Sequence, residues 1–382
     1  MDLNLSADDL DLRERIVSFA QNELSSGVLD RDRAHQFSRD LWDKCGAMGL
    51  TGLPVPETHG GSALSPLSCA VALEALGYGC TDGGLAFSVC AHLLACVVPI
   101  WKHGSDSMKQ KYLSDLCAGR LIAVNAMTEP QTGSDPFGMA TRADRQGEGY
   151  RIRGTKMFCS NGPVADIAVV YAATDKSKGY HGGITAFLIP TSTPGFNVGQ
   201  VFEKMGLRTS PISELVLDDV FVPDENVIGK PGGGGPVFAE SMDWERALLG
   251  ACHLGTMQRL LEGALRHART RKQFGHLICK NQAVSHKIVD MKVRLEAAKW
   301  LIYRAASALD VSREAGLHAA IAKLHASEAF VESARTALQV MGGYGYMVES
   351  EIERVLRDAI GSTIYSGTSE MQRNIIARWL GM

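Results

Sequence analysis

The sequence predicts an α+β protein that is mostly α-helical, with helices at both ends of the chain and a β-rich part between them. Apolar residues recur at every third and fourth position up to about residue 120. Short β-type runs between Gly, Asp and Pro turns follow, and long helical patterns occupy the remainder. We place three domains at 1–121, 122–235 and 236–382. Because strands and helices do not alternate, a doubly wound nucleotide-binding fold is excluded.

The first domain shows the periodicity of packed helices, for example at Leu41, Cys45 and Met48. Turn residues separate its helical segments at 54–61, 81–84 and 104–106. The stretch 83–101 holds no Asp, Glu, Lys or Arg over 19 residues, which is about the length of a bilayer span. It contains Pro99 and paired glycines, and no cluster of positive residues flanks it. We therefore expect a helix buried inside the domain, with a membrane span as the alternative.

The second domain is predicted from four β-type runs, at 150–153, 167–172, 184–189 and 215–222. The run Pro-Gly-Gly-Gly-Gly-Pro at 231–236 predicts a loop or mobile hinge, and it matches no nucleotide-binding glycine motif. Beyond it, three stretches are long enough for bundle helices, at 237–272, 281–311 and 314–342. Two shorter helices are expected at about 350–360 and 369–380.

Composition narrows the class of protein. The 382 residues carry a net charge of -3 and no basic patch, so nucleic acid is not an expected partner. Nine cysteines without a C-x-x-C pair argue against a disulfide framework or a zinc site, so we expect no metal and a reducing cytoplasm. The first ten residues include three acidic groups and no basic one, which argues against a secretory signal or a transit peptide.

Five segments hold the candidate chemistry. They lie at 126–135, 154–162, 269–275 with Gln282 beyond it, 339–345 and 364–372. Hydroxyl residues and glycine on a turn offer donors to an electron-rich ligand, and arginine binds a phosphate with two donors at once. The Gly-Thr-Ser of the last segment can cap a helix whose N–H groups meet an anion. Each segment taken alone also fits an ordinary turn, core strand or helix end.

Together and in this order, the five segments resemble the acyl-CoA dehydrogenase family over essentially the whole chain. The segments 204–208, 353–358 and 375–378 support the resemblance. It implies an N-terminal helical domain, a middle β-barrel-like domain and a C-terminal four-helix bundle. It also implies FAD as the cofactor, a homotetramer or at least a dimer, and removal of hydrogen from the carbon next to a thioester carbonyl.

The resemblance implies a set of FAD contacts. Around the flavin ring it places Ala126, Met127, Thr128, Gly133, Ser134, Phe158, Cys159 and Ser160. For the adenylate half it indicates Arg271, Gln273, Phe274 and Gln282. Residues that reach the FAD of a neighbouring subunit are Gln339, Val340, Gly342 and Gly343. The turn after the thioester site, which also touches FAD, contains Thr368, Ser369 and Glu370.

The catalytic base is where this chain departs from most relatives. They carry Glu in a Tyr-Glu-Gly-Thr turn, where this chain has Ser366, and a serine hydroxyl is too weak a base for a carbon acid. A minority branch places its Glu on an early bundle helix just before an Arg, which indicates Glu245 here. The alternative is a Glu in a helix N-terminal turn, stabilised by the helix dipole. The substrate contacts implied are Ser134, Asp243, Trp244, Arg246, Ser366 and Gly367, with core packing and a helix start as alternatives for Trp244 and Asp243.

The thioester itself is indicated by similarity alone. Residues 87–99, Trp244-Glu245 and 366–368 look like the prolyl-carrier-protein oxidases of natural-product pathways, so we expect a prolyl group on a phosphopantetheinyl carrier protein. A short branched-chain acyl-CoA dehydrogenase and a flavin monooxygenase on the same fold are the alternatives. A flavin-free helical scaffold is a third alternative, from another class. Either an electron-transfer flavoprotein or O2 would accept the electrons.

Overall fold

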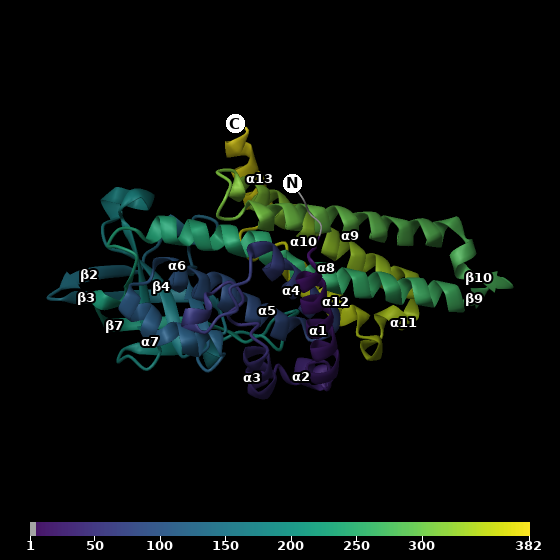
Figure 1. Cartoon of the computed structure of the whole chain (residues 1–382), viewed down its shortest axis with the longest axis horizontal. Coiled ribbons are helices and arrows are strands. Elements are labelled where there is room, and N and C mark those ends of the chain that lie inside the picture. Colours follow the sequence, from purple (N-terminus) through teal and green to yellow (C-terminus); the bar gives the residue numbers. More distant parts are fainter. Residues whose placement is uncertain (1–4) are drawn as a thin grey trace.

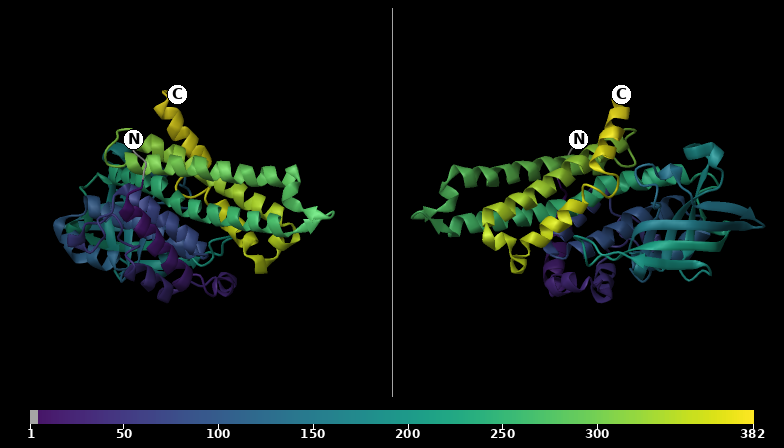
Figure 2. Two further views of the ribbon diagram at one scale, coloured as in Figure 1. Left: turned by 45° about the vertical axis from the view of Figure 1, so that its right-hand side comes forward. Right: turned by 180° about the vertical axis from the view of Figure 1, so that it is seen from behind.

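The structure, a computed structural model, describes residues 5–382. The molecule is elongated, with the β-sheet at one end and a bundle of long helices reaching the other (Figure 1). The longest helix, α8 (Gly234–Thr270), runs from the sheet to the far tip of the bundle. The C-terminal helix α13 (Ser369–Trp379) projects from the bundle, as both views of Figure 2 show.

Seven α-helices make up the N-terminal part of the described chain. They are α1 (Ala7–Glu23), α2 (Val28–Ala34), α3 (Arg39–Ala47), α4 (Pro66–Gly79), α5 (Gly83–His92), α6 (Val98–His103) and α7 (Asp106–Cys117). Side-chain caps explain several of their starts: Ser65 accepts a hydrogen bond from the N–H of Ser68, and Ser105 accepts one from that of Met108. Such caps satisfy N–H groups that have no partner inside the helix.

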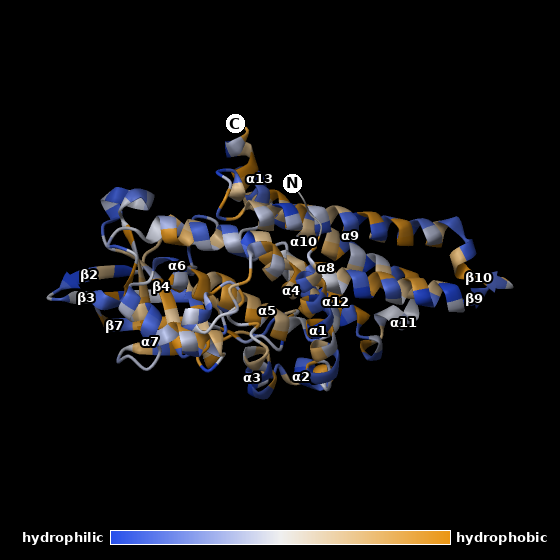
Figure 3. Ribbon diagram, in the orientation of Figure 1, coloured by the Kyte–Doolittle hydropathy of each residue, from blue (hydrophilic) through white to orange (hydrophobic). Residues whose placement is uncertain are grey.

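The uncharged stretch 83–101 is a core helix. A π-helical turn at Leu93–Val97 joins α5 and α6 into one helix, Gly83–His103, and 83% of its most apolar 18-residue window is buried inside the protein. Figure 3 shows α4 and α5 as largely hydrophobic helices in the interior of the molecule. Burial between other helices therefore explains why this stretch has no charged residues, and the prediction of a buried helix is confirmed.

The middle of the chain forms one eight-stranded sheet. Its strands are β1 (Ala123–Ala126), β2 (Arg142–Gln146), β3 (Gly149–Ser160), β4 (Ile167–Ala173), β5 (Ile184–Pro190), β6 (Phe196–Val201), β7 (Ile212–Pro223) and β8 (Val227–Ile228). The strand order is β6-β7-β3-β2-β4-β5-β8, with β1 parallel to β4. Side chains from this sheet, including Val170, Phe187 and Leu215, enclose a core of their own. The sheet thus curves around an interior like a barrel, although β6 and β8 leave it open at the edges.

The C-terminal part begins earlier than the sequence predicted. Helix α8 starts at Gly234, inside the glycine run that was expected to be loop up to residue 236. Two tiny strands, β9 (Lys272–Gln273) and β10 (His276–Leu277), form a hairpin at the far tip. The remaining helices are α9 (Gln282–Ala308), α10 (Ala315–Met341), α11 (Gly343–Tyr346), α12 (Ile352–Gly361) and α13.

The two helical parts share one hydrophobic core, because α4 packs closely along α8. The close approach depends on two glycines. A Cβ on Gly77 would lie 2.0 Å from the carbonyl oxygen of Cys252, and one on Gly255 would lie 2.1 Å from that of Glu74. Larger residues at either position would force the helices apart. This contact fixes α5, which lies between the sheet and α8, beside the candidate site.

Candidate active site

Glu245 lies about three turns into α8, well inside the helix. The effect of a helix dipole fades within the first turn, so the helix-start interpretation of this glutamate is wrong. Its carboxylate accepts a hydrogen bond from the hydroxyl of Ser366. Burial raises the pKa of Glu245 above its ordinary value, while Ser366 and the charges of Arg246 and Lys323 oppose that rise. A carboxylate in this state is a stronger base than an exposed one.

Ser366 lies on a turn. Hydrogen-bond donors from three helices hold this turn in place. Ser366 and Gly367 both have positive φ, of 57° and 84°. From α8, Arg246 Nε donates to the carbonyl of Ser366 at 3.3 Å. From α13, Gln372 Nε2 donates to the carbonyls of Ser366 and Gly367 at 3.1 and 2.8 Å, and from α10, Lys323 Nζ donates to that of Gly367 at 2.7 Å. Because both carbonyls are engaged, the turn is held in one conformation.

The same turn presents free donors beside the carboxylate of Glu245. Among the described residues, the backbone N–H groups of Ser366 and Gly367 donate to no protein acceptor. N–H groups that are fixed in place and unpaired can stabilise negative charge that develops on a nearby oxygen. The site therefore pairs a partly buried carboxylate with hydrogen-bond donors, which is the arrangement needed to remove a proton next to a carbonyl group.

Two positive side chains surround this carboxylate. Burial lowers the pKa of Lys323 to about 8, with Arg246 adding to the decrease. Arg246 is also paired with Asp243, whose carboxylate lies 3.6 Å from its guanidinium. Burial raises the pKa of Asp243, and Arg246 opposes that shift. Glu245 thus lies in a small network of charges, of which Lys323 is buried and the others are partly buried, and the position of each cation is tied to the turn at 366–367.

The Trp244 side chain does not point toward the carboxylate of Glu245. It is 1% exposed and packs edge-on against Trp101, with ring centroids 6.0 Å apart. Lys102 lies over the Trp244 ring at 5.2 Å. Successive residues of a helix point about 100° apart, so the indole lies on a different face of α8 from Glu245. The position of Trp244 fits core packing.

A buried ion pair between Lys156 and Glu129 holds the segment that follows β1. Lys156 Nζ donates to Glu129 at 2.8 Å and to the carbonyl of Met127 at 3.1 Å. Glu129 also accepts from the backbone N–H groups of Ala140 and Thr141. Burial by itself raises the pKa of Glu129, but Lys156 and the hydrogen bonds from Thr141 and Ala140 together hold that pKa below its ordinary value. Ala126 and Met127 are buried beneath this loop, while Gly133 and Ser134 are exposed at its tip.

A β-bulge presents Phe158 to solvent. The register of β3 against β7 shifts between Lys156 and Cys159, and Phe158 has a φ of 56°. Its ring is 58% exposed and contacts Phe202 at a centroid distance of 5.5 Å. A bulky residue with positive φ is strained, and such strain persists where function requires a side chain to be aimed in one direction. Cys159 is buried beside it, and Ser160 ends the strand.

A second group of predicted residues lies at the far tip of the bundle. We call it the distal rim and define it as 271–275 together with 339–344. Arg271 lies over the ring of Tyr344, with its guanidinium carbon 5.9 Å from the centroid. Phe274 is 93% exposed with a φ of 51°, and Gly275, Gly342 and Gly343 each face open space where a Cβ would be. Gln273 and Gln282 are exposed on the same tip, and Gln339 and Val340 end α10 next to it.

The distal rim is far from Glu245 along the same helix. Glu245 and Arg271 are separated by about 39 Å at 1.5 Å per residue, because α8 is continuous between them. One extended dinucleotide does not span that distance. The structure thus unites the 271–275 and 339–344 segments with each other and separates both from the base of the same chain.

The last predicted group caps α13. The Thr368 hydroxyl accepts a hydrogen bond from the N–H of Met371, as expected for a helix start, and Glu370 is exposed in the first turn. The Ser369 hydroxyl is buried and has no hydrogen-bond partner among the described residues. These residues lie next to the turn at 366–367 and form one side of the neighbourhood of Glu245.

Sequence reasoning missed several residues of the site. Lys323 and Gln372, which hold the turn, were not singled out, and neither were Lys156 and Glu129 beneath the exposed loop. Lysine within an Ala-rich helix at 319–326 was the available signal for Lys323, because a charge among small residues has to find a buried partner. Among the described residues, no group of three or more His, Cys, Asp or Glu side chains is placed to hold a metal ion.

Comparison with known proteins defines the class to which this fold and site belong. Residues 6–120, 125–220 and 232–381 match the N-terminal, middle and C-terminal domains of acyl-CoA dehydrogenases. The chain belongs to the acyl-CoA dehydrogenase family.

Within the family, the chain is similar to two enzymes named L-prolyl-(peptidyl-carrier protein) dehydrogenase. It is 43% identical over 382 residues to that of a Serratia species, covering 100% of this chain and 99% of the relative. It is 44% identical over 350 residues to that of Pseudomonas fluorescens, covering 91% and 92%. Among solved structures, the prolyl acyl carrier protein oxidase AnaB matches with a TM-score of 0.97 at 43% identity, covering 99% of this chain and 100% of AnaB. PigA with FAD and proline also matches at 0.97 and 43%, covering 100% and 99%.

Proposed function

We propose that this protein is an FAD-dependent enzyme that dehydrogenates or oxidises an aminoacyl thioester, with a prolyl group on a peptidyl-carrier protein as its substrate. The observation that carries the proposal is the partly buried Glu245, whose carboxylate accepts a hydrogen bond from Ser366. Glu245 provides a base from α8, and this base lies beside the turn in which most relatives carry their glutamate. Relatives named for the prolyl thioester match along at least 91% of this chain.

The residues of the chain fit FAD. At the distal rim, Arg271 makes no ion pair with any described residue, and the ring of Phe274 is 93% exposed. A free guanidinium can bind a phosphate, and an exposed aromatic ring can pack against a planar group. The exposed ring of Phe158 can likewise pack against a planar group, and the buried Ser369 hydroxyl, which has no partner among the described residues, can form a hydrogen bond.

The proposed flavin contacts are those that the family resemblance implies. Near the ring we place Ala126, Met127, Thr128, Gly133, Ser134, Phe158, Cys159, Ser160, Thr368, Ser369 and Glu370. At the adenylate end we place Arg271, Gln273, Phe274, Gln282, Gln339, Val340, Gly342 and Gly343. When bound, FAD supplies a two-electron acceptor for the hydrogen that leaves the substrate as hydride.

The chain's own residues account for the proton chemistry. Glu245 takes the proton from the carbon next to the thioester carbonyl, because burial raises its pKa and strengthens it as a base. The free N–H groups at 366–367 stabilise the negative charge that grows on the carbonyl oxygen as the proton leaves. Arg246, Lys323 and Gln372 hold those donors in place through the carbonyls of the same turn. The Ser366 hydroxyl orients the carboxylate of Glu245.

We propose that the active unit contains at least two chains, as in a homotetramer. The 39 Å between Glu245 and Arg271 is the support, since one cofactor cannot meet both within one chain. The distal rim of one copy would therefore hold the adenylate end of a cofactor whose ring lies beside Glu245 of another copy. Nine free cysteines suit a reducing compartment such as the cytoplasm. Natural-product biosynthesis is the setting that we propose, because it uses aminoacyl groups on carrier proteins.

The test is anaerobic absorbance of the flavin after mixing the FAD-loaded protein with its substrate. Prolyl-carrier protein should bleach the flavin rapidly, whereas isovaleryl-CoA at the same concentration should not. Bleaching by isovaleryl-CoA alone would overturn the carrier-protein assignment in favour of a branched-chain acyl-CoA substrate. Readmitting air, and separately adding an electron-transfer flavoprotein, then shows which acceptor restores the absorbance.

A further inference from the structure

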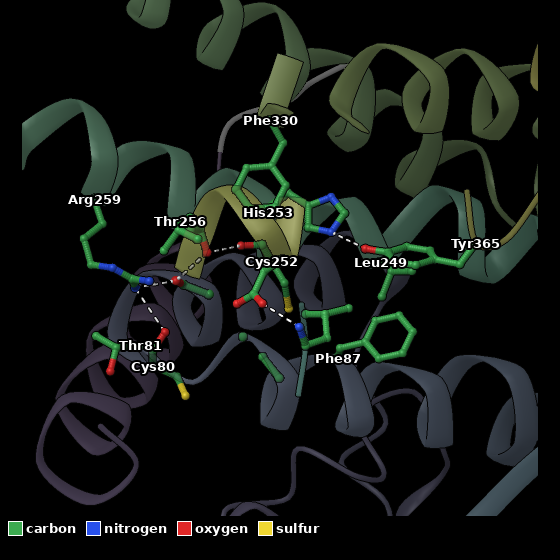
Figure 4. Close-up of a pocket in the computed structure, with 16 residues that line it drawn as sticks. Cys80, Thr81, Phe87, Leu249, Cys252, His253, Thr256, Arg259, Phe330 and Tyr365 are labelled. Carbon is green, nitrogen blue, oxygen red and sulfur yellow. Dashed lines mark hydrogen bonds between the residues drawn. The ribbon is translucent and has the colours of Figure 1, made fainter. Parts of the chain in front are cut away.

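A small, partly enclosed cavity lies one helical turn beyond Glu245, on the same face of α8. Its volume is about 40 Å³, which holds no more than a few water-sized groups. Leu249, Cys252, His253 and Thr256 line it from α8 (Figure 4). Since the spacing from Glu245 to Leu249 is four residues, the cavity begins about 6 Å from the base along the helix axis.

Aromatic side chains line this cavity next to the turn that carries Ser366. Tyr365, the residue before Ser366, packs against Phe87 of α5 with ring centroids 4.8 Å apart. The hydroxyl of Tyr365 and Nε2 of His253 form a hydrogen bond of 2.9 Å (Figure 4). The imidazole of His253 in turn stacks on Phe330 of α10, at 4.8 Å and 17°. The Tyr365 ring is therefore held by its contact with Phe87 and, at its hydroxyl, by His253.

The histidine is built to remain neutral in this position. Burial lowers the pKa of His253 to about 3, and the charge of Lys323 adds to the decrease. Neutral imidazole and phenol can share one hydrogen bond without placing a net charge in the core. The contact between His253 and Tyr365 is thus stable across the pH range in which the protein would work.

The far end of the cavity is polar. Arg259 lies there, and its Nη1 donates to the backbone carbonyls of Gly77, Tyr78 and Cys80 at 2.8, 2.8 and 3.0 Å. Asp358 is also in the lining. An alkyl chain that reached this end would meet polar groups that already have hydrogen-bond partners, and it would gain little from displacing those partners.

We infer that Phe87, Tyr365 and His253 form a gate that sets the depth of the acyl site, so that the enzyme accepts compact acyl groups such as a prolyl ring and rejects linear chains. This inference rests on the proposed function for the identity of the thioester, but the depth limit stands on the geometry alone. A ring bound beside Glu245 ends before the gate. A linear chain would have to displace Tyr365 from its hydrogen bond and from its contact with Phe87 to proceed along α8.

The wild-type, FAD-loaded protein provides the first test. The rate of anaerobic flavin bleaching is measured with prolyl, isobutyryl, butyryl, hexanoyl and octanoyl groups on the same carrier protein. We expect the rate to fall by at least about tenfold between butyryl and octanoyl, because each excluded methylene costs about tenfold or more. Equal rates for butyryl and octanoyl thioesters would overturn the gate. Failure of the prolyl thioester together with a fall after butyryl would overturn the prolyl assignment and leave the gate intact.

Phe87→Ala provides the second test, with Phe37→Ala as its matched control. Both phenylalanines are partly buried and pack on the same helical core, but Phe37 contacts Trp42 and does not line the cavity. Phe87→Ala should raise the ratio of octanoyl to prolyl bleaching rates by at least about tenfold, while Phe37→Ala leaves the ratio unchanged. An equal ratio in the two variants would overturn the gate. If Phe87→Ala does not fold, the wild-type series decides.

Discussion

The neighbourhood of Glu245 and the distal rim differ in how completely one chain satisfies them. Around Glu245, the carboxylate accepts a hydrogen bond from Ser366, and three helices hold the carbonyls of the turn at 366–367. At the distal rim, Phe274 is 93% exposed and three glycines face open space. The difference supports the proposal that proton removal is organised within one chain, whereas FAD binding at the rim would need a second chain to complete it.

The largest effect is expected in the neighbourhood of Glu245. Replacing the carboxylate in Glu245→Gln removes the base without changing its size, so flavin bleaching by prolyl-carrier protein should slow by about 10³-fold with the flavin retained. Stopped-flow absorbance measures the rate. Glu240→Gln, on the same helix and paired with His103, is the control and should stay within about threefold of wild type. Near-normal bleaching by Glu245→Gln would remove this residue from the mechanism.

A substitution at the distal rim should weaken FAD binding and leave proton removal by Glu245 unchanged. Arg271→Ala deletes a charged donor, and FAD should bind about 10- to 100-fold more weakly, because hydrogen bonds to charged groups contribute about 1.5–3 kcal/mol. Titration of apoprotein with FAD, followed by fluorescence, measures the dissociation constant. Arg269→Ala lies two residues earlier and serves as the matched control. An unchanged FAD affinity in Arg271→Ala would refute the role of the distal rim.

The smallest effect is expected for a substitution that loosens the turn at 366–367. Lys323→Met removes a donor to the Gly367 carbonyl, and the bleaching rate should fall about tenfold through loss of positioning. The charge of Lys323 also lowers the pKa of Glu245. Without it that pKa rises, and since Glu245 acts as a base only when ionised, the acid limb of the pH–rate profile should move to higher pH.

The control for Lys323→Met is Lys299→Met, which breaks an ion pair with Glu74 elsewhere in the bundle. It should lower stability without moving the acid limb. A simple loss of stability in both variants, with identical pH profiles, would show that Lys323 is structural only. Arg at position 323 keeps the charge and should restore the position of the acid limb.

Much of the fold followed from periodicity, because burial imposes it directly. The three long helices and the four β runs lie where the 3.6- and 2-residue patterns placed them. The start of α8 was wrong because glycine is a poor helix former, yet Gly234 and Gly235 lie against β5 and Tyr180, where a side chain would clash. The contact of α4 with α8 was not predictable, since nothing in a single sequence pairs Gly77 with Gly255.

The sequence by itself determined the helical–β–helical order and the family resemblance, and that resemblance indicated Glu245 as the proposed base, since Ser366 lacks the chemistry of a base. Only the tertiary structure decided how that base is controlled. It brought Lys323, Arg246 and Gln372 from three helices to one turn, and it placed Tyr365 against His253 and Phe87. It also separated Arg271 from Glu245 by the length of α8. Contacts between residues far apart in the chain depend on how helices pack, and a linear pattern of residue types does not contain that information.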